Sequence, residues 1–129
     1  NGIKNVRFET GDAFKTIQAF NVEGRKFGAV VLDPPKFAAN RQALPDALRA
    51  YERLNVGAIN LLEMGGILVT CSCTGGVSRE DFTYILAEAA ARTRRPLQIL
   101  ETRGAAPDHP FSASCLETEY LKCFICRVG

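Results

Sequence analysis

The chain has 129 residues, of which 47% are hydrophobic and 23% are charged, and this composition excludes a disordered protein. Its length is that of one ordinary domain. The net charge is only +2, which is too small a bias to indicate nucleic-acid binding by itself. No apolar run reaches the roughly 18 residues of a membrane helix.

The first elements along the chain are predicted to be a strand, a helix and a second strand. Residues 6–9 alternate between polar and apolar side chains, as in a short strand. Asp12 is a plausible helix N-cap, and apolar residues then recur at helical spacing from Phe14 to Phe20. Residues 27–32 form a nearly continuous apolar run, which is typical of a strand buried on both faces of a parallel sheet. Pro34 must end this strand because proline cannot donate to the ladder.

The later elements are two helices and three strands. Gly65-Gly66 is expected to end the first of these helices, and Ser78 with Asp81 resembles a capping box that opens the second. We predict these elements in order: loop 36–43, helix 45–63, strand 66–72, turn 74–76, helix from 78 to about 92, strand 97–102, irregular segment 104–118 and strand 119–128.

Strands and helices thus alternate, which predicts an α/β protein with a Rossmann-like, doubly wound sheet. Ligands of such sheets bind at the carboxyl ends of the strands. Asp12, Asp33 and Cys73 each follow a predicted strand at that end. We therefore expect these three residues to lie at one site.

The first candidate for chemistry is the segment Asp33-Pro34-Pro35-Lys36-Phe37. Proline removes donors and fixes φ, so carbonyl acceptors dominate such a turn. A carboxylate beside fixed carbonyls suits an exocyclic amino group or a ring N–H, and Phe37 offers a face for a planar base. A loop that only ends a strand with prolines explains the pattern about equally well.

The second candidate is Cys73, which leaves its strand into a turn of small polar residues. A thiol there can be accessible and hydrogen-bonded, as a nucleophile needs to be. Cys71 lies deeper in the strand and is better explained as a small buried hydrophobe. Asp12 is interpreted either as an acceptor for an adenine amino group or as a plain helix cap, and the cap is the simpler explanation.

The five cysteines bear on the compartment and on metal binding. An odd number of cysteines without an export signal is typical of a reduced protein inside the cell, so we expect a cytoplasmic location. Four of them, with His109, are enough in number for zinc. However, Cys123 and Cys126 are three apart in a predicted strand and face opposite sides of it. We therefore expect no metal site.

Two further groups of polar residues allow more than one interpretation. His109 is the single histidine and precedes a proline in a polar loop, where it is either a surface residue or a base. Arg92, Arg94 and Arg95 cluster at a predicted helix end. They are interpreted first as complementing the helix dipole and second as contacting an RNA backbone.

In their order along the chain, several motifs resemble the class I S-adenosylmethionine-dependent RNA methyltransferases, and more closely the bacterial large-subunit rRNA cytosine-C5 methyltransferases. The resemblance covers nearly the whole chain. Its carriers are Gly11-Asp12-Ala13-Phe14, residues 32–38 with Asp33-Pro34-Pro35, residues 51–55, residues 65–70, Ser72-Cys73-Thr74, Asp108-His109-Pro110 and residues 117–122.

The resemblance implies a role for each matching residue, with S-adenosylmethionine as the cofactor and rRNA as the partner. Cys73 would attack carbon 6 of a cytosine, with Asp33 as the second catalytic residue. The target base would have to be unpaired or flipped out. Pro34, Pro35, Lys36 and Phe37 would hold that base. The cofactor would be bound by Asp12, Ala13, Phe14 and Asp33.

The chain departs from this family in lacking its glycine-rich cofactor loop, since no Gly-x-Gly-x-Gly occurs. We therefore expect residues 1–129 to be the C-terminal part of a catalytic domain, without its first two strands and its N-terminal RNA-binding domain. The expected fold is an incomplete class I methyltransferase sheet with a C-terminal antiparallel strand. Such a fragment should be inactive alone and bind cofactor poorly, and its bare sheet edge would favour a homodimer.

Two other functions are compatible with these residues. A guanine or amino N-methyltransferase of the same fold would use the Asp-Pro-Pro element but would need no cysteine nucleophile. A non-catalytic fragment would serve only for binding or dimerisation. Retention of Asp12, Asp33 and Cys73 together favours an enzyme for the parent protein.

Overall fold

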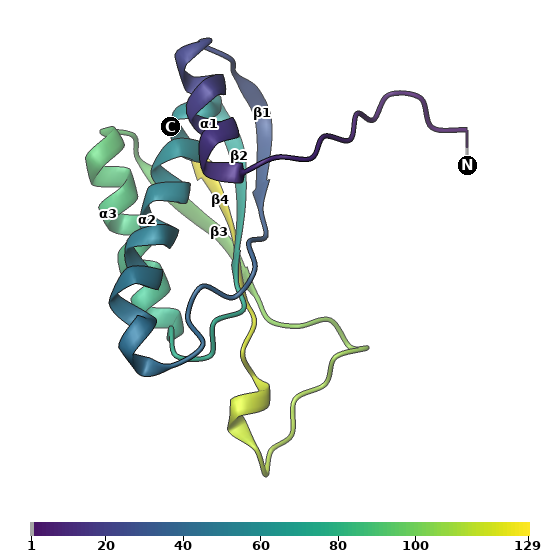
Figure 1. Cartoon of the computed structure of the whole chain (residues 1–129), viewed down its shortest axis with the longest axis vertical. Helices are drawn as coiled ribbons and strands as arrows, with labels where there is room; N and C mark the ends of the chain where they lie inside the picture. The colour runs from purple at the N-terminus through teal and green to yellow at the C-terminus, as the bar shows by residue number, and fades with distance from the viewer. Residues whose placement is uncertain (1) are drawn as a thin grey trace.

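The computed structural model describes residues 2–129 and contains one four-stranded sheet with a single layer of helices (Figure 1). The elements in chain order are α1 (Ala13–Val22), β1 (Phe27–Leu32), α2 (Leu44–Leu61), β2 (Leu62–Ser72), α3 (Arg79–Thr93), β3 (Leu97–Arg103) and β4 (Lys122–Val128). Short 3-10 turns at Arg41–Ala43 and Leu116–Thr118 interrupt the two long loops. The α/β prediction is confirmed.

The sheet is mixed, and its strand order is β1-β2-β4-β3. β1 and β2 run parallel, whereas β4 is antiparallel to both of its neighbours. The last strand of the chain therefore lies inside the sheet, with Ser72 at the end of β2 opposite Lys122 at the start of β4. This confirms the predicted C-terminal antiparallel strand. The edges of the sheet among residues 2–129 are β1 and β3.

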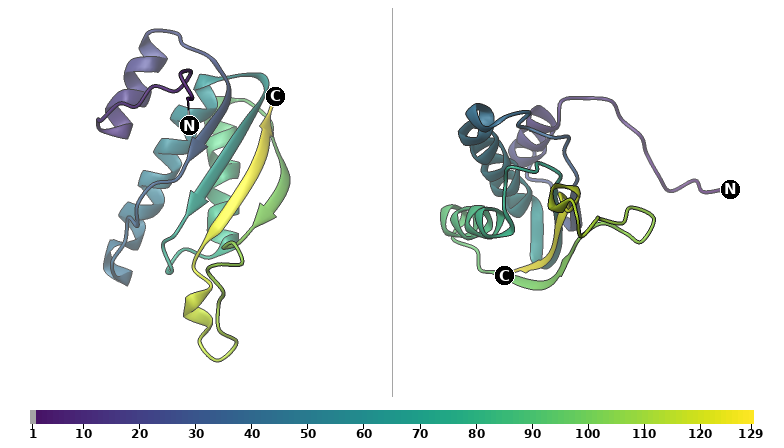
Figure 2. Two further views of the ribbon diagram at one scale, coloured as in Figure 1. Left: turned by 90° about the vertical axis from the view of Figure 1, so that its right-hand side faces the viewer. Right: turned by 90° about the horizontal axis from the view of Figure 1, so that it is seen from below.

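All three helices cover the same face of the sheet, as both views in Figure 2 show. Strand residues alternate between the two faces, so Leu68, Thr70 and Ser72 are buried beneath the helices. Val31 points to the opposite face and is 67% exposed. The expectation that residues 27–32 are buried on both faces is therefore wrong for the described chain, because only one helical layer is present in it.

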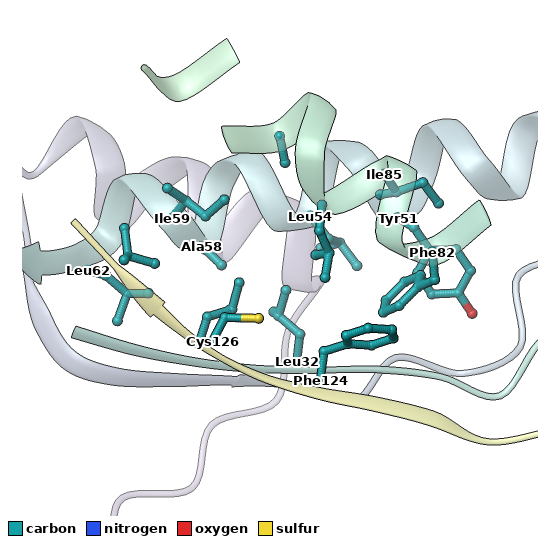
Figure 3. Packing of buried hydrophobic residues seen from close by; sticks show 14 of the residues in the cluster. Leu32, Tyr51, Leu54, Ala58, Ile59, Leu62, Phe82, Ile85, Phe124 and Cys126 are labelled. Atoms are coloured by element: carbon teal, nitrogen blue, oxygen red, sulfur yellow. The ribbon is translucent and has the colours of Figure 1, made fainter. Parts of the chain in front are cut away.

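The core lies between α2, α3 and the sheet, and aromatic rings run through it (Figure 3). Tyr51 meets Phe82 edge-on with ring centroids 5.4 Å apart, and Phe82 lies 5.6 Å from Phe124. Such pairs add about 0.5–1.5 kcal/mol each beyond their area burial. The same rings extend toward the carboxyl end of the parallel strands through Phe37, 4.8 Å from Tyr51.

Local signals explain how the helices begin. The side chain of Asp12 accepts a hydrogen bond from the Lys15 amide at 3.0 Å and caps α1. Ser78 and Asp81 form the reciprocal capping box that was predicted for α3. Both caps satisfy amides that have no partner within their helix.

Two predictions about local structure are wrong. Residues 6–9 form no strand, since residues 2–12 contain no helix or strand, and an isolated strand has no partner for its backbone groups. Gly65-Gly66 does not end the preceding helix, because α2 stops at Leu61 and both glycines lie within β2. Gly65 has φ of +76°, and the β1–β2 register is irregular beside it.

Candidate functional site

Two segments meet at the carboxyl ends of the neighbouring parallel strands β1 and β2. The Sγ atom of Cys73 lies 3.9 Å from the carbonyl oxygen of Pro34. The amide of Phe37 donates a hydrogen bond of 3.3 Å to Oγ1 of Thr74. The structure thus brings Cys73 beside the loop that begins at Asp33, as their places after adjacent strands predict.

The residues of this site differ in their exposure to solvent. Asp33, Pro35 and Lys36 are exposed, whereas Pro34, Phe37 and Cys73 are half-buried. The thiol is therefore partly covered, and the loop beside it carries an exposed carboxylate and an exposed cation, Asp33 and Lys36. Such a position suits a nucleophile that must meet a ligand from solvent.

The start of α1 borders the same site. The ring of Phe14 lies 6.2 Å from that of Phe37, centroid to centroid, and the guanidinium of Arg53 lies 4.2 Å from the Phe14 centroid. Asp12 and Ala13 are exposed. In the described residues the carboxylate of Asp12 contacts only its own helix start, so the structure shows it as a cap.

A groove of about 460 Å³ runs between residues 9–13, α1 and β1. Gly11, Ala13 and Leu32 are among its lining residues, and most of the lining is apolar. Its volume lies within the range of small-molecule sites. The groove therefore places a ligand-sized space beside Gly11 and Ala13, the two chain neighbours of Asp12.

Thr74 connects the elements around the thiol. Its hydroxyl is 2.8 Å from the hydroxyl of the buried Tyr51 and also accepts the Phe37 amide. Its carbonyl accepts hydrogen bonds from the amide of Val77 at 3.1 Å and from Nζ of Lys122 at 2.8 Å. The residue that follows Cys73 is thus held from α2, β4 and the loop after β1.

The contributions of Tyr51 and Lys122 to this site were missed from the sequence. Tyr51 has the spacing of a core residue, and nothing in that spacing reveals a partner for its hydroxyl. For Lys122, the direction of the side chain can be predicted from the sequence. In the predicted strand, Phe124, Cys126 and Val128 are apolar at alternate positions, so the same alternation points Lys122 toward the core.

Two cysteines within the strands, Cys71 and Cys126, have raised pKa values. Burial raises the pKa of Cys71 to about 12, and its neighbour Cys123, directly opposite on β4, acts in the same direction. Burial likewise raises the pKa of Cys126 to about 11. Both thiols are therefore protonated at neutral pH and unsuited to nucleophilic attack. Cys71 was interpreted as a small buried hydrophobe, and the structure shows it half-buried.

The remaining candidates lie away from the thiol or have other partners. His109 is exposed in the loop after β3, and its own backbone amide bonds to Ala106. Arg92 pairs with Glu52 of α2 at 2.7 Å, and Arg94 ends α3 with φ of 53°. Arg95 follows α3 in the chain, but its side chain donates to the backbone carbonyls of Ile59 and Leu62, at the end of α2. The three arginines therefore do not act as one cluster.

Two kinds of feature are absent from the described residues. Among residues 2–129, no group of three or more His, Cys, Asp or Glu side chains is arranged to hold a metal ion. Nor does the described chain contain a helix that is long and apolar enough to cross a membrane. The cytoplasmic location stays a prediction.

Comparison with known proteins identifies close sequence relatives. No protein-family model matches the chain. It is 40% identical over 126 residues to ribosomal RNA large subunit methyltransferase I of Erwinia tasmaniensis, and 41% identical to the protein of the same name from Salmonella arizonae. Each match covers 98% of this chain but only 32% and 31% of the relative. The chain thus spans about a third of the length of these curated relatives.

Solved structures share the fold at low sequence identity. SMU.776 in complex with SAH superposes on 91% of this chain and 30% of its own, with a TM-score of 0.74 and 16% identity. NSun6 from Pyrococcus horikoshii with SFG covers 98% of this chain and 35% of its own, at a TM-score of 0.61 and 18% identity. The fold is that of the class I methyltransferases, which confirms the predicted fold class.

Proposed function

We propose that the full-length protein is an S-adenosylmethionine-dependent methyltransferase that acts on carbon 5 of a cytosine in large-subunit rRNA, with Cys73 as nucleophile. The names of the sequence relatives support methylation of large-subunit rRNA. Because the chain spans about a third of those relatives, the activity is assigned to the full-length protein. The geometry around Cys73 supports the choice of cytosine carbon 5.

The described residues fit the adenosyl part of the cofactor. The carboxylate of Asp12 is exposed and accepts one hydrogen bond through Oδ1, so Oδ2 is available to an adenine amino group. Ala13 lines the groove of about 460 Å³, and the half-buried ring of Phe14 lies nearby. Exposed Asp33 directly follows Leu32, which lines this groove. Bound there, the cofactor supplies the methyl group from its sulfonium.

One observation carries the cytosine mechanism: Sγ of Cys73 lies 3.9 Å from the carbonyl oxygen of Pro34. In our proposal, a base held by Asp33 and the carbonyls of Pro34 and Pro35 lies against this thiol. Lys36 and Phe37 border the base, and the Phe37 ring offers a stacking face. The base must first leave its helix, since neither face of a stacked base is open to a thiol.

The chemistry of the cysteine follows from this arrangement. The thiolate of Cys73 forms a bond to carbon 6, the carbon 5–carbon 6 double bond breaks, and its electron pair makes carbon 5 nucleophilic. After methylation a base removes the proton from carbon 5. The double bond then re-forms and the bond from carbon 6 to Cys73 breaks, which returns the thiolate. Covalent attachment thus activates a carbon that is otherwise a poor nucleophile.

The test replaces the thiol in the full-length protein. Cys73→Ala should lower methylation of a large-subunit rRNA transcript by about 10³-fold or more, because no other group can form the adduct. Cys71→Ala is the matched control. It removes a thiol two residues away whose pKa of about 12 keeps it protonated, and it should retain activity.

The position of the methyl group is read by mass spectrometry of the nucleosides from the product RNA, against 5-methylcytidine and N-methylated standards, and bisulfite sequencing locates the modified cytosine. A methyl group on carbon 5 protects that cytosine from conversion. A normal rate for Cys73→Ala, or a methyl group on an exocyclic amine, would instead assign the site to base-amino methylation. Absence of methylation by the full-length wild-type protein, with rRNA still bound, would assign it to binding alone.

A further inference from the structure

Lys122 is a buried lysine that the proposed chemistry does not use. It is 6% exposed, although lysine is among the side chains that are almost never buried without a partner. Nζ donates a 2.8 Å hydrogen bond to the carbonyl of Thr74. Among residues 2–129, no carboxylate lies within 4.0 Å of this ammonium, so a backbone carbonyl is its principal partner.

A lysine buried in this way contributes little to the free energy of unfolding. Burial lowers the pKa of Lys122, and Arg79 acts in the same direction, while Asp81 and the Cys73 thiol oppose that change. The cost of removing an ammonium from water is offset only in part by one hydrogen bond to a neutral acceptor. A methionine would fill the same space without that cost. A role other than packing explains the residue better.

The partner of Lys122 indicates that role. Thr74 directly follows Cys73, and its carbonyl has two donors: Nζ of Lys122 and the amide of Val77. On its other side, the Thr74 hydroxyl meets Tyr51 and the Phe37 amide. The turn that carries the thiol is therefore fixed from both sides, and Lys122 is the contact that comes from β4.

We infer that Lys122 is a positioning residue for Cys73: its ammonium, at the start of β4, holds the Thr74 carbonyl and so fixes the turn that presents the thiol to the base. This inference rests on the proposed function, since it concerns the nucleophile of that reaction. Lys122 does not itself touch the base or the cofactor. Its effect reaches the reaction through the geometry of residues 73–77.

The experiment compares Lys122→Met with Lys26→Met in the full-length protein. Lys26 also donates to a backbone carbonyl, that of Asn60 at 2.6 Å, but it is exposed and lies at the opposite end of the sheet. Lys122→Met should lower kcat for rRNA methylation by about 10- to 100-fold, with KM within about twofold of wild type, because misplacing a reacting group by about 1 Å costs that much. Lys26→Met should leave both constants unchanged.

Two further measurements separate positioning from a general loss of structure. In Lys122→Met the amide of Val77, which shares the Thr74 carbonyl, should exchange its hydrogen faster, while amides in the centre of α2 keep their protection. Lys122→Arg retains a donor for the same carbonyl and should keep more activity than the methionine variant.

Clear outcomes would overturn the inference. These are an unchanged kcat in Lys122→Met, a rise in KM alone, a loss of kcat that matches the loss of folded protein, or a folded Lys122→Arg that is as slow as Lys122→Met. Cys73→Ala is assayed in parallel. If that variant methylates normally, the proposed function itself fails; if it is inactive while Lys122→Met is fully active, only the inference about Lys122 fails.

Discussion

The two ends of the sheet each contain a basic side chain bound to backbone carbonyls, and the two differ in what they hold. At the amino end of β2, Arg95 donates to the carbonyls of Ile59, Leu62, Glu63 and Gly129 at 2.6–2.9 Å. At the carboxyl end, Lys122 donates to the single carbonyl of Thr74. The first arrangement joins elements of the fold to one another, and the second holds the turn that follows Cys73.

The comparison separates two roles of a basic side chain: Arg95 stabilises the fold, whereas in our inference Lys122 positions a single turn. Arg95 donates to the carbonyl of Ile59 in α2, which also accepts the amide of Leu62, and to the carbonyls of Leu62 and Glu63 just beyond that helix. It ties this segment to Gly129, which follows β4. A planar guanidinium can serve several acceptors at once, whereas an ammonium has one compact charge. Changes at the amino end should therefore lower stability, and changes at the carboxyl end should lower activity more than stability.

Arg95→Met gives the largest expected change in stability. It removes every one of these hydrogen bonds, and we expect the free energy of unfolding to fall by about 2–4 kcal/mol. Urea denaturation measures this value. Arg94→Met is the matched control, since Arg94 is exposed and makes no side-chain hydrogen bond within the described residues. If Arg95→Met were as stable as the control, the structural role of the amino end would be wrong.

Tyr51→Phe tests the carboxyl end with a smaller change. It removes the hydroxyl that lies 2.8 Å from Oγ1 of Thr74, and we expect a loss of about 1 kcal/mol in stability. Because Thr74 then loses one of its anchors, kcat should also fall, by about tenfold, while KM stays near wild type. Steady-state kinetics on the folded variant check this. If folded Tyr51→Phe were as active as the wild type, the carboxyl end of the sheet would not differ from the amino end in its effect on activity.

Arg94→Gly should produce the smallest effect, with the opposite sign. Arg94 ends α3 in the left-handed region at φ of 53°, which glycine adopts without the steric cost of a Cβ atom. We expect a gain of about 0.5 kcal/mol in stability and no change in methylation. Thermal unfolding beside the Arg94→Met variant measures the gain. A loss of stability would mean that the arginine side chain makes a contact in solution that favours it.

Much of the fold was predictable because its signals are local. The capping box of Ser78 with Asp81, the N-cap at Asp12 and the apolar run of β1 each depend on residues close in the chain. The end of α2 was not predictable from Gly65-Gly66, because those glycines serve an irregularity within β2. Residues 6–9 have a strand-like pattern but no partner strand among residues 2–129.

The candidate site was predictable only in its outline. Asp33 and Cys73 could be placed together because they follow adjacent parallel strands. The contacts that hold the thiol could not, since Tyr51, Thr74 and Lys122 come from three elements whose packing no spacing reveals. Alternation along the last strand points the Lys122 side chain toward the core, but it does not reveal Thr74 as its partner. That contact depends on the place of β4 between β2 and β3, which is set by pairing across the whole chain.

The interior place of β4 also has a consequence for how the chain folds. β2 and β3 have no direct pairing and are joined only through β4, and Lys122 and Thr74, which meet at that junction, are 48 residues apart. Bringing such distant segments together costs loop-closure entropy before any contact compensates it. The sheet therefore cannot be completed strand by strand in the order of synthesis. It is completed only when β4 pairs with both β2 and β3, and the pairing of β4 with β2 also brings Lys122 to the turn after Cys73.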